Sequence, residues 1–88
     1  MQRVIKHYAA PSFWVVYEQL PESIKKLAAK NYDLLKENPK HPSIHFKKVG
    51  GPWSARVGMR YRALATEVDD GFLWFWIGSH EDYNKLIN

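Results

Sequence analysis

The chain has 88 residues and a formal net charge of +4 at pH 7, with 45% hydrophobic and 15% aromatic residues. This length accommodates one domain, so we expect a single domain over residues 1–88 with an aromatic-rich core. Cysteine is absent, which excludes disulfides and cysteine-based zinc sites. No apolar run approaches the roughly 18 residues of a membrane span, and the N-terminus lacks the apolar stretch of a signal peptide. We therefore expect a cytoplasmic protein.

Charge is distributed unevenly along the sequence. The interval from Lys40 to Arg62 contains six basic residues and no acidic one, whereas the interval from Glu67 to Asp82 contains five acidic residues and no Lys or Arg. A basic block within a globular pattern is an electrostatic footprint for phosphate or for an acidic partner. The alternative is a solvated surface that keeps the protein soluble.

The first half of the chain has the apolar spacing of two helices. Residues 13–20 carry apolar side chains at i, i+3, i+4 and i+7, and Pro11 before them suits a first helical turn. Pro21 interrupts this pattern and can begin the next helix. A second apolar stripe follows and ends at Asn38–Pro39, because the residue before a proline avoids helical backbone. We expect a hairpin of two helices of about ten and sixteen residues.

After His41–Pro42 the apolar period becomes that of strands. Ser79 is a predicted N-cap for a last short helix. The predicted strands and turn are, in chain order, 45–49, 53–57, 61–66, the Asp70–Gly71 hairpin signal and 72–77. The order of elements predicts an α+β fold: an N-terminal helical hairpin packed on a small antiparallel sheet of three to four strands, with a short C-terminal helix.

The strand pattern also predicts where the cations lie. Alternation places Arg60 and Arg62 on the side of Leu64, opposite Tyr61 and Ala63. Arginines on a sheet face that the helices leave uncovered would form a basic concavity.

The segment Trp53–Leu64 reads WSARVGMRYRAL. It resembles the signature of the RelE/ParE toxin superfamily, in which a strand carrying Arg-Val-Gly is followed directly by a strand that starts Tyr-Arg. The lead-in is similar as well, with Leu20–Pro21 opening the second helix, Asn38–Pro39 ending it, and Lys47–Gly50 before the first long strand. The segment Ile77–Tyr83 resembles the family's C-terminal ending, so the resemblance covers roughly residues 12–88.

The resemblance implies a toxin of a bacterial type II toxin–antitoxin system with a compact fold of two helices and four strands. It implies a cognate antitoxin protein as partner, an extended or helical segment of which wraps the toxin, and it implies no cofactor and no metal. The superfamily is divided by target. RelE-like members cut mRNA in the ribosomal A site, whereas ParE-like members inhibit DNA gyrase and cut nothing.

RNA cleavage without a metal uses the substrate's own 2′-OH as nucleophile. A base takes its proton, hydrogen-bond donors stabilise the extra charge on the phosphorane, and an acid protonates the leaving 5′ oxygen. DNA lacks the 2′-OH, so this chemistry selects RNA. Basic side chains at such a site both bind the backbone and stabilise the transition state.

Two arginines match the family's strand arginines. Arg62 is our candidate for the transition-state contact, because a guanidinium binds phosphate through two parallel hydrogen bonds. The alternative is a structural arginine paired with a carboxylate such as Glu67. Arg56 matches the arginine of the first strand, for which a structural and a functional role are equally compatible with the sequence.

Further phosphate-binding candidates are Lys47, Lys48 and Arg60. The two lysines precede a glycine turn and can bind RNA or ribosomal phosphates. We expect only one of them to face the site, because neighbouring residues of a strand point to opposite sides. Arg60 is equally compatible with a surface role.

His80 follows the predicted central strand and starts the last helix, where the helix N-terminus favours the neutral imidazole that can act as a base. The negative charges of the neighbouring Glu81 and Asp82 instead favour the charged imidazolium. Tyr83 matches the family's C-terminal tyrosine, which can stack on a base or assist proton transfer. The structural alternatives are local capping or packing for His80 and an apolar helix contact for Tyr83.

Two positions depart from the family's pattern. RelE-like nucleases usually carry a further Arg or Lys near the catalytic residue at the C-terminus, where this chain has Glu81 and Asp82. Either these carboxylates face away from the phosphate site, or catalysis is weak or lost. Three functions therefore remain: a ribosome-dependent mRNA endonuclease, a ParE-like gyrase inhibitor without nuclease activity, and a non-catalytic member that binds an antitoxin or nucleic acid.

The tryptophans Trp53, Trp74 and Trp76 offer flat rings on which bases can stack. In a domain of this size, we expect a core role for the two tryptophans of the central strand.

Overall fold

The computed structural model describes residues 5–87. The expectation that the N-terminus carries no signal peptide extends to residues 1–4, which lie outside the described residues. None of the described helices is long and apolar enough to cross a membrane. The elements are, in chain order, β1 (Lys6–Ala9), α1 (Pro11–Tyr17), α2 (Glu22–Glu37), β2 (Lys47–Lys48), β3 (Trp53–Val57), β4 (Tyr61–Val68), β5 (Gly71–Ser79) and α3 (His80–Ile87).

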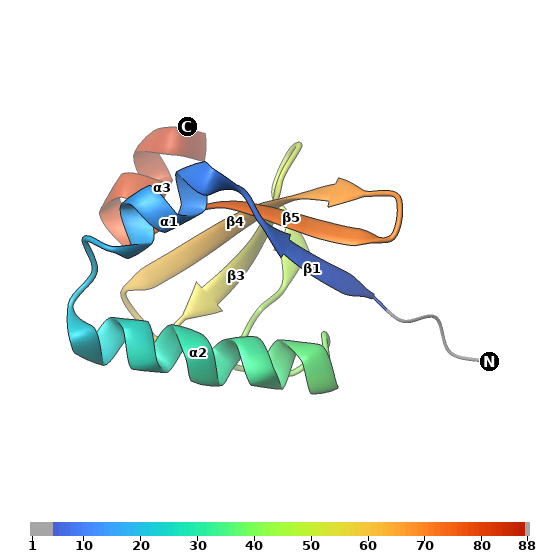
Figure 1. Ribbon diagram of the computed structural model, residues 1–88, viewed down its shortest axis with the longest axis horizontal. Coiled ribbons are helices and arrows are strands. Elements are labelled where there is room, and N and C mark those ends of the chain that lie inside the picture. The colour runs from blue at the N-terminus through green and yellow to red at the C-terminus, as the bar shows by residue number, and fades with distance from the viewer. Residues whose placement is uncertain (1–4, 88) are drawn as a thin grey trace.

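The strands form one five-stranded sheet in the order β1-β5-β4-β3-β2 (Figure 1). β1 runs parallel to β5, and all other neighbours are antiparallel. The predicted α+β class is confirmed, but the sheet has five strands rather than three to four. The strand that the sequence did not indicate is β1, which has only four residues and lacks an apolar alternation.

The approach of β1 to β5 depends on Gly71. A β-carbon built at Gly71 would lie 1.8 Å from the carbonyl oxygen of Lys6, so no other residue fits this position without moving β1. The Lys6 N–H donates to the carbonyl oxygen of Asp70 at 2.9 Å, and the Tyr8 hydroxyl donates to the Asp70 carboxylate at 2.7 Å. The Asp70–Gly71 turn therefore both reverses the chain and anchors β1.

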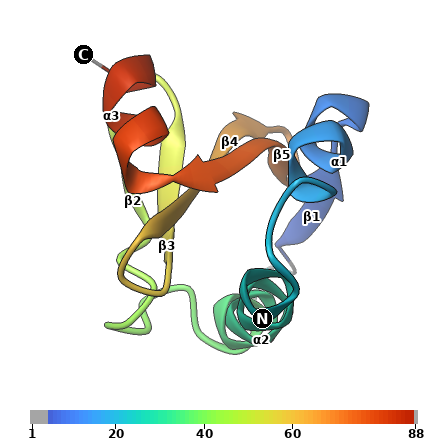
Figure 2. The same cartoon turned by 90° about the vertical axis from the view of Figure 1, so that its left-hand side faces the viewer.

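The three helices lie on both sides of the sheet. α1 packs on β5 and α2 packs on β3, and Figure 2 shows α2 and α3 on opposite sides of the strands. Pro11 is the first residue of α1, and Pro21 is the N-cap of α2. α2 has the predicted 16 residues, whereas α1 has 7. The apolar side chains predicted for the first helix pack against the core, namely Phe13, Val16, Tyr17 and Leu20.

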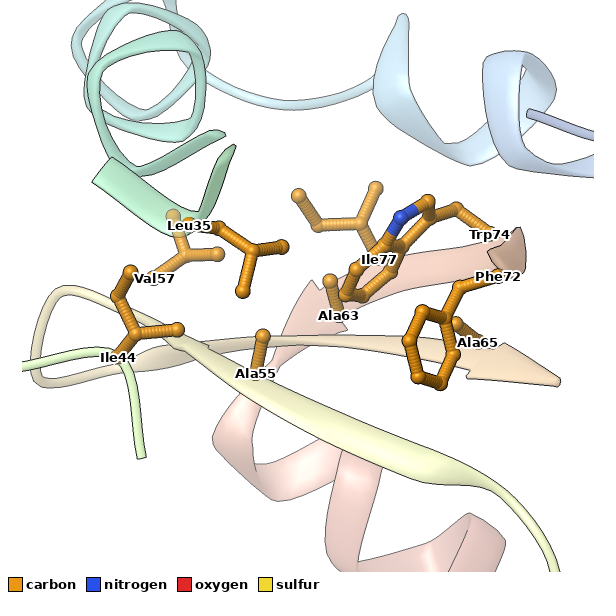
Figure 3. Packing of buried hydrophobic residues seen from close by; sticks show 9 residues of the cluster. All are labelled: Leu35, Ile44, Ala55, Val57, Ala63, Ala65, Phe72, Trp74 and Ile77. Atoms are coloured by element: carbon orange, nitrogen blue, oxygen red, sulfur yellow. The ribbon is translucent and has the colours of Figure 1, made fainter. Parts of the chain in front are cut away.

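The core lies between the sheet and the first two helices (Figure 3). The inward positions of β3 and β4 include three alanines, which leave room for the rings of Trp74 and Phe72 from β5. Small and large side chains facing each other in this way fill the interior at close packing. The nine buried residues of this cluster are Leu35, Ile44, Ala55, Val57, Ala63, Ala65, Phe72, Trp74 and Ile77.

A β-bulge sends the two tryptophans of β5 to opposite faces. Trp76 pairs with Leu64, whereas Trp74 pairs with the next residue of β4, so the register skips Phe75. In a regular strand, residues two apart share a face, and the bulge breaks this rule. Trp74 belongs to the core cluster together with Ile77. Trp76, which immediately precedes Ile77, is half-buried on the other face, so the predicted core role holds for Trp74 and is wrong for Trp76.

His7 connects β1 to the centre of the sheet and to α2. Trp74 Nε1 donates a hydrogen bond to His7 Nδ1 at 3.0 Å, and the ring of Tyr32 meets the imidazole edge-on with the ring centroids 5.6 Å apart. Burial lowers the pKa of His7 from its ordinary value, and the charge of Lys36 lowers this pKa further. The folded protein therefore favours the neutral imidazole, with Nδ1 as the acceptor.

Candidate functional site

β3 and β4 bring two arginines together on the sheet face opposite the core. The register pairs Arg56 directly with Arg62, so both side chains project from the same face. Both residues are half-buried. Arg60 was expected on this face as well, but the chain turns between β3 and β4 at this residue, and Arg60 is exposed in the turn.

Arg62 is held by two neighbours. Its Nη1 donates to the carbonyl oxygen of Tyr61 at 2.9 Å, and its guanidinium carbon lies 6.0 Å from the ring centroid of Tyr83. Burial lowers the pKa of Arg62, the positive charge of Arg56 lowers this pKa further, and Tyr83 acts in the opposite direction. A guanidinium remains a cation at neutral pH. The lowered pKa therefore means that the surroundings of Arg62 disfavour its positive charge, and a bound anion would offset this effect.

Arg56 has a fixed backbone and an unsatisfied side chain. Its N–H donates to the carbonyl oxygen of Ile44 at 2.6 Å, and its own carbonyl accepts a hydrogen bond from Asn31 Nδ2 at 3.1 Å. The loop before β2 and helix α2 thus both anchor this position. The side-chain Nε is buried and has no hydrogen-bond partner among the described residues. An unsatisfied buried donor costs about 1–3 kcal/mol, so this atom too favours a bound acceptor.

No carboxylate of the described residues forms an ion pair with this arginine pair. Within residues 5–87, the ion pairs involve three lysines and neither Arg56 nor Arg62. Glu67, the carboxylate considered as a structural partner for Arg62, instead accepts a hydrogen bond from Trp53 Nε1 at 3.2 Å. Like charges directly opposite each other destabilise a sheet. An unneutralised pair of this kind is a candidate anion-binding site.

β2 extends the cationic face to the edge of the sheet. Lys47 pairs with Ser54 and Lys48 pairs with Trp53. Ser54 shares a face with Arg56, two residues further along β3, so Lys47 projects to the side of the arginine pair. Lys48 projects with Trp53 to the core side. The register therefore gives one of the two exposed lysines to each face.

The start of α3 lies beside the arginine pair. The His80 N–H donates to the carbonyl oxygen of Arg60 at 2.6 Å, which fixes α3 against the turn between β3 and β4. The imidazole stacks on Tyr83 with ring centroids 6.1 Å apart, and the Tyr83 ring in turn faces Arg62. Tyr83 is 7% exposed, whereas His80 is exposed. The structure thus brings His80, Tyr83 and the two arginines into one cluster whose imidazole is open to solvent.

Glu81 and Asp82 occupy the first turn of α3. The Ser79 hydroxyl accepts a hydrogen bond from the Asp82 N–H at 3.2 Å, which confirms Ser79 as the N-cap. Carboxylates in a first helical turn are stabilised by the helix dipole. Both carboxylates are exposed, and neither forms an ion pair in the part of the chain that the structure describes. They have a local role in the helix and leave the arginine pair unneutralised.

One residue of this face was expected in the core from the sequence. Trp76 lies opposite Leu64, next to the pair formed by Arg62 and Gly78. The segment 72–77 is apolar at every position, so its pattern contains no signal for the bulge that turns Trp76 toward the arginines.

The opposite face of the sheet carries an apolar groove of about 430 Å³ between α1, α2 and the strands. Its lining includes Phe13, Tyr17, Ala28, Tyr32 and Leu35. Among residues 5–87, no group of three or more His, Asp or Glu is placed to hold a metal ion.

Residues 22–85 match the family of ParE-like toxin domains. The match spans more than half of the chain, and the chain therefore belongs to the ParE-like toxin domain family. No curated protein matches the sequence.

Solved structures of toxins have the same fold. A chain of the RelB–RelE antitoxin–toxin complex from Methanococcus jannaschii has a TM-score of 0.70 at 15% identity, over 92% of this chain and 99% of that chain. The archaeal RelE–RelB complex from Pyrococcus horikoshii OT3 has a TM-score of 0.63 at 16% identity, over 86% of this chain and 94% of that chain. A copper-bound mutant toxin from Helicobacter pylori has a TM-score of 0.61 at 18% identity, over 89% of this chain and 97% of that chain. At these identities the likeness concerns the fold.

Proposed function

We propose that this protein is the toxin of a toxin–antitoxin pair and acts in the cytoplasm as a metal-independent, ribosome-dependent mRNA endonuclease. The observation that carries the proposal is the arginine pair, which no described carboxylate neutralises and which lies beside an exposed imidazole. Membership of a toxin-domain family supports the role of toxin and is compatible with either target.

In the proposed reaction, Arg56 and Arg62 bind the non-bridging oxygens of the scissile phosphate. The 2′ oxygen forms a bond to phosphorus, and the bond from phosphorus to the 5′ oxygen breaks. The products are a 2′,3′-cyclic phosphate and a 5′-hydroxyl. Negative charge grows on the phosphorane during attack, and donors that are already in place stabilise this charge without reorganisation. The buried Nε of Arg56 has no acceptor among residues 5–87, and a bound phosphate would offer one.

Proton transfer is assigned to His80. Its imidazole is exposed and contacts Tyr83, whose ring also contacts Arg62, so an accessible proton donor and acceptor belongs to the same cluster as the proposed phosphate site. Tyr83 contacts both groups and is buried, which makes it the residue that fixes their separation. Lys47, at the edge of the same face, would bind a neighbouring backbone phosphate.

The proposed antitoxin would neutralise the same face. A carboxylate placed between Arg56 and Arg62 satisfies the buried Nε and offsets the repulsion of the two charges. The RelE-like structures to which this chain is similar are complexes with an antitoxin, RelB. We expect complex formation with the cognate antitoxin to weaken when Arg62 is replaced by Met, as measured by calorimetry.

A second candidate function is inhibition of DNA gyrase without nuclease activity. The observation that favours it is the acidic first turn of α3, where exposed Glu81 and Asp82 stand close in sequence to His80. Carboxylates near a phosphate site oppose RNA binding. This candidate predicts that the protein blocks supercoiling by gyrase, that mRNA stays intact, and that toxicity survives replacement of His80.

Cleavage of mRNA on programmed ribosomes tests the proposal. We expect wild-type protein to cut in the A-site codon, Arg62→Met to lower the rate by about 10²–10³-fold, and His80→Gln to lower it by about 10²–10⁴-fold. Lys30→Met is the matched control, because it removes an exposed charge from α2 on the other side of the sheet. Circular dichroism verifies that each variant is folded. Intact mRNA in the presence of folded wild-type protein would exclude the nuclease and leave the gyrase assay to decide.

A further inference from the structure

Trp76 is the aromatic side chain that β5 sends to the face of the arginine pair. The bulge at Phe75 places it there, since Trp76 pairs with Leu64 while its neighbour Ile77 lies in the core. The ring is half-buried, so part of it remains accessible. The other three tryptophans are on different surfaces or in the core.

The indole of Trp76 lies over Gly78. A β-carbon built at Gly78 would meet the ring atoms Cζ2 at 2.5 Å and Cη2 at 2.8 Å. Gly78 is the residue paired with Arg62 across β4 and β5. Because Gly78 has no side chain, the place opposite Arg62 is filled by the indole instead. Trp76 therefore lies on the sheet face from which Arg62 projects, at the position diagonal to Arg62 in the pairing of β4 with β5.

A cation next to a flat ring matches the chemistry of a nucleotide, which joins a phosphate to a planar base. Aromatic side chains bind single-stranded RNA by stacking on its bases, and cationic side chains bind its phosphates. We propose that the Trp76 indole stacks on one of the two nucleobases that flank the phosphate bound by Arg56 and Arg62. This inference rests on the proposed nuclease function and adds to it a base-binding subsite.

Packing alone does not require a tryptophan at position 76. If Trp76 only covered Leu64, which is 2% exposed, any large apolar side chain would serve. The six-membered ring of the indole lies close over Gly78, and because Trp76 is only half-buried, part of the side chain stays accessible to a second ring.

Cleavage kinetics on programmed ribosomes test the subsite with Trp76→Phe and Trp76→Leu. Stacking on an aromatic side chain predicts a loss of about 5- to 150-fold in kcat/KM for Trp76→Leu, with most of the activity retained by Trp76→Phe. Trp14→Leu is the matched control, because Trp14 is 50% exposed on α1, away from the arginine pair. Gly78→Ala is a second perturbation, which displaces the indole without removing it. Thermal unfolding of each variant reports whether the fold is retained.

An mRNA with an abasic nucleotide on one or the other side of the scissile phosphate separates stacking from packing. We expect one of the two abasic substrates to be cut slowly by wild-type protein and equally slowly by Trp76→Leu, since the stacking partner is then already missing. A loss for Trp76→Leu that is the same on the normal mRNA and on both abasic mRNAs would overturn the subsite, and so would a Trp76→Leu variant as active as wild type. Absence of cleavage by wild-type protein would instead overturn the nuclease function and the subsite with it.

Discussion

Replacing Arg56 by methionine is expected to stabilise the fold and at the same time to slow cleavage strongly. Methionine keeps an unbranched apolar side chain on the sheet, but it removes the buried Nε without a partner and the charge directly opposite Arg62. A residue kept for packing would show the reverse, because its replacement would cost stability. Gain of stability with loss of activity is the signature of a site that binds a ligand.

Two contributions set the size of the effect. Removal of an unsatisfied buried donor returns about 1–3 kcal/mol, and removal of a like charge directly opposite on the neighbouring strand returns about 0.2–1 kcal/mol. Arg56 is only half-buried, so we expect the lower part of these ranges, about 1–2 kcal/mol in total. For a domain of 88 residues, this corresponds to a rise in Tm of about 5–10 °C.

Thermal unfolding followed by circular dichroism, at low salt and at about 1 M salt, measures this prediction. Charge repulsion is screened at high salt, whereas the desolvation of Nε is not, so the difference between Arg56→Met and wild type should shrink with salt but not vanish. Cleavage by the variant should fall by about 10²–10³-fold. A variant with a lower Tm than wild type would refute the reasoning and show that Arg56 is structural.

Three further predictions address the fold and the cationic face. Gly71→Ala should lower the free energy of unfolding by about 3 kcal/mol or more, because its β-carbon would lie 1.8 Å from a β1 carbonyl oxygen; wild-type stability in urea would contradict the placement of β1. Burial depresses the pKa of His7 in the folded protein, so the unfolded chain binds more protons, and stability present above pH of about 6.5 is lost as the pH falls through the folded-state pKa. His7→Asn keeps an acceptor for Trp74 but does not titrate, so its Tm should fall less than the wild-type Tm between roughly pH 7.5 and pH 5. Parallel curves of Tm against pH for the two proteins would count against this role of His7. Lys47→Met should reduce the salt slope of single-stranded RNA binding by about 0.7 and Lys48→Met by less, whereas equal losses would contradict the register of β2.

The helices and the arginine face could be predicted because their patterns are uninterrupted. Apolar residues at helical spacing from Phe13 to Leu20 do pack on the core. Alternation from Tyr61 to Leu64 places Arg62 opposite Ala63, as the register has it. The same alternation fails for Arg60, because the chain reverses there and a turn has no strand periodicity.

Two features could not be predicted from the sequence. The residues of β1 have no apolar alternation, and the strand is held by parallel pairing with β5, more than 60 residues away along the chain. The bulge in β5 is hidden because residues 72–77 are apolar at every position, which erases the period that would reveal a skipped residue. The position of Trp76 beside Arg62 follows from that bulge and was therefore visible only in the structure.

The most direct test of the proposed mechanism is cleavage of mRNA with a single 2′-deoxy nucleotide at the scissile position, on programmed ribosomes. The reaction needs the 2′ oxygen as nucleophile, so the all-ribose mRNA should be cut in the A-site codon to leave a 2′,3′-cyclic phosphate, and the 2′-deoxy mRNA should stay intact. Cleavage of the 2′-deoxy mRNA, or an all-ribose mRNA that remains uncut by folded protein, would contradict the account.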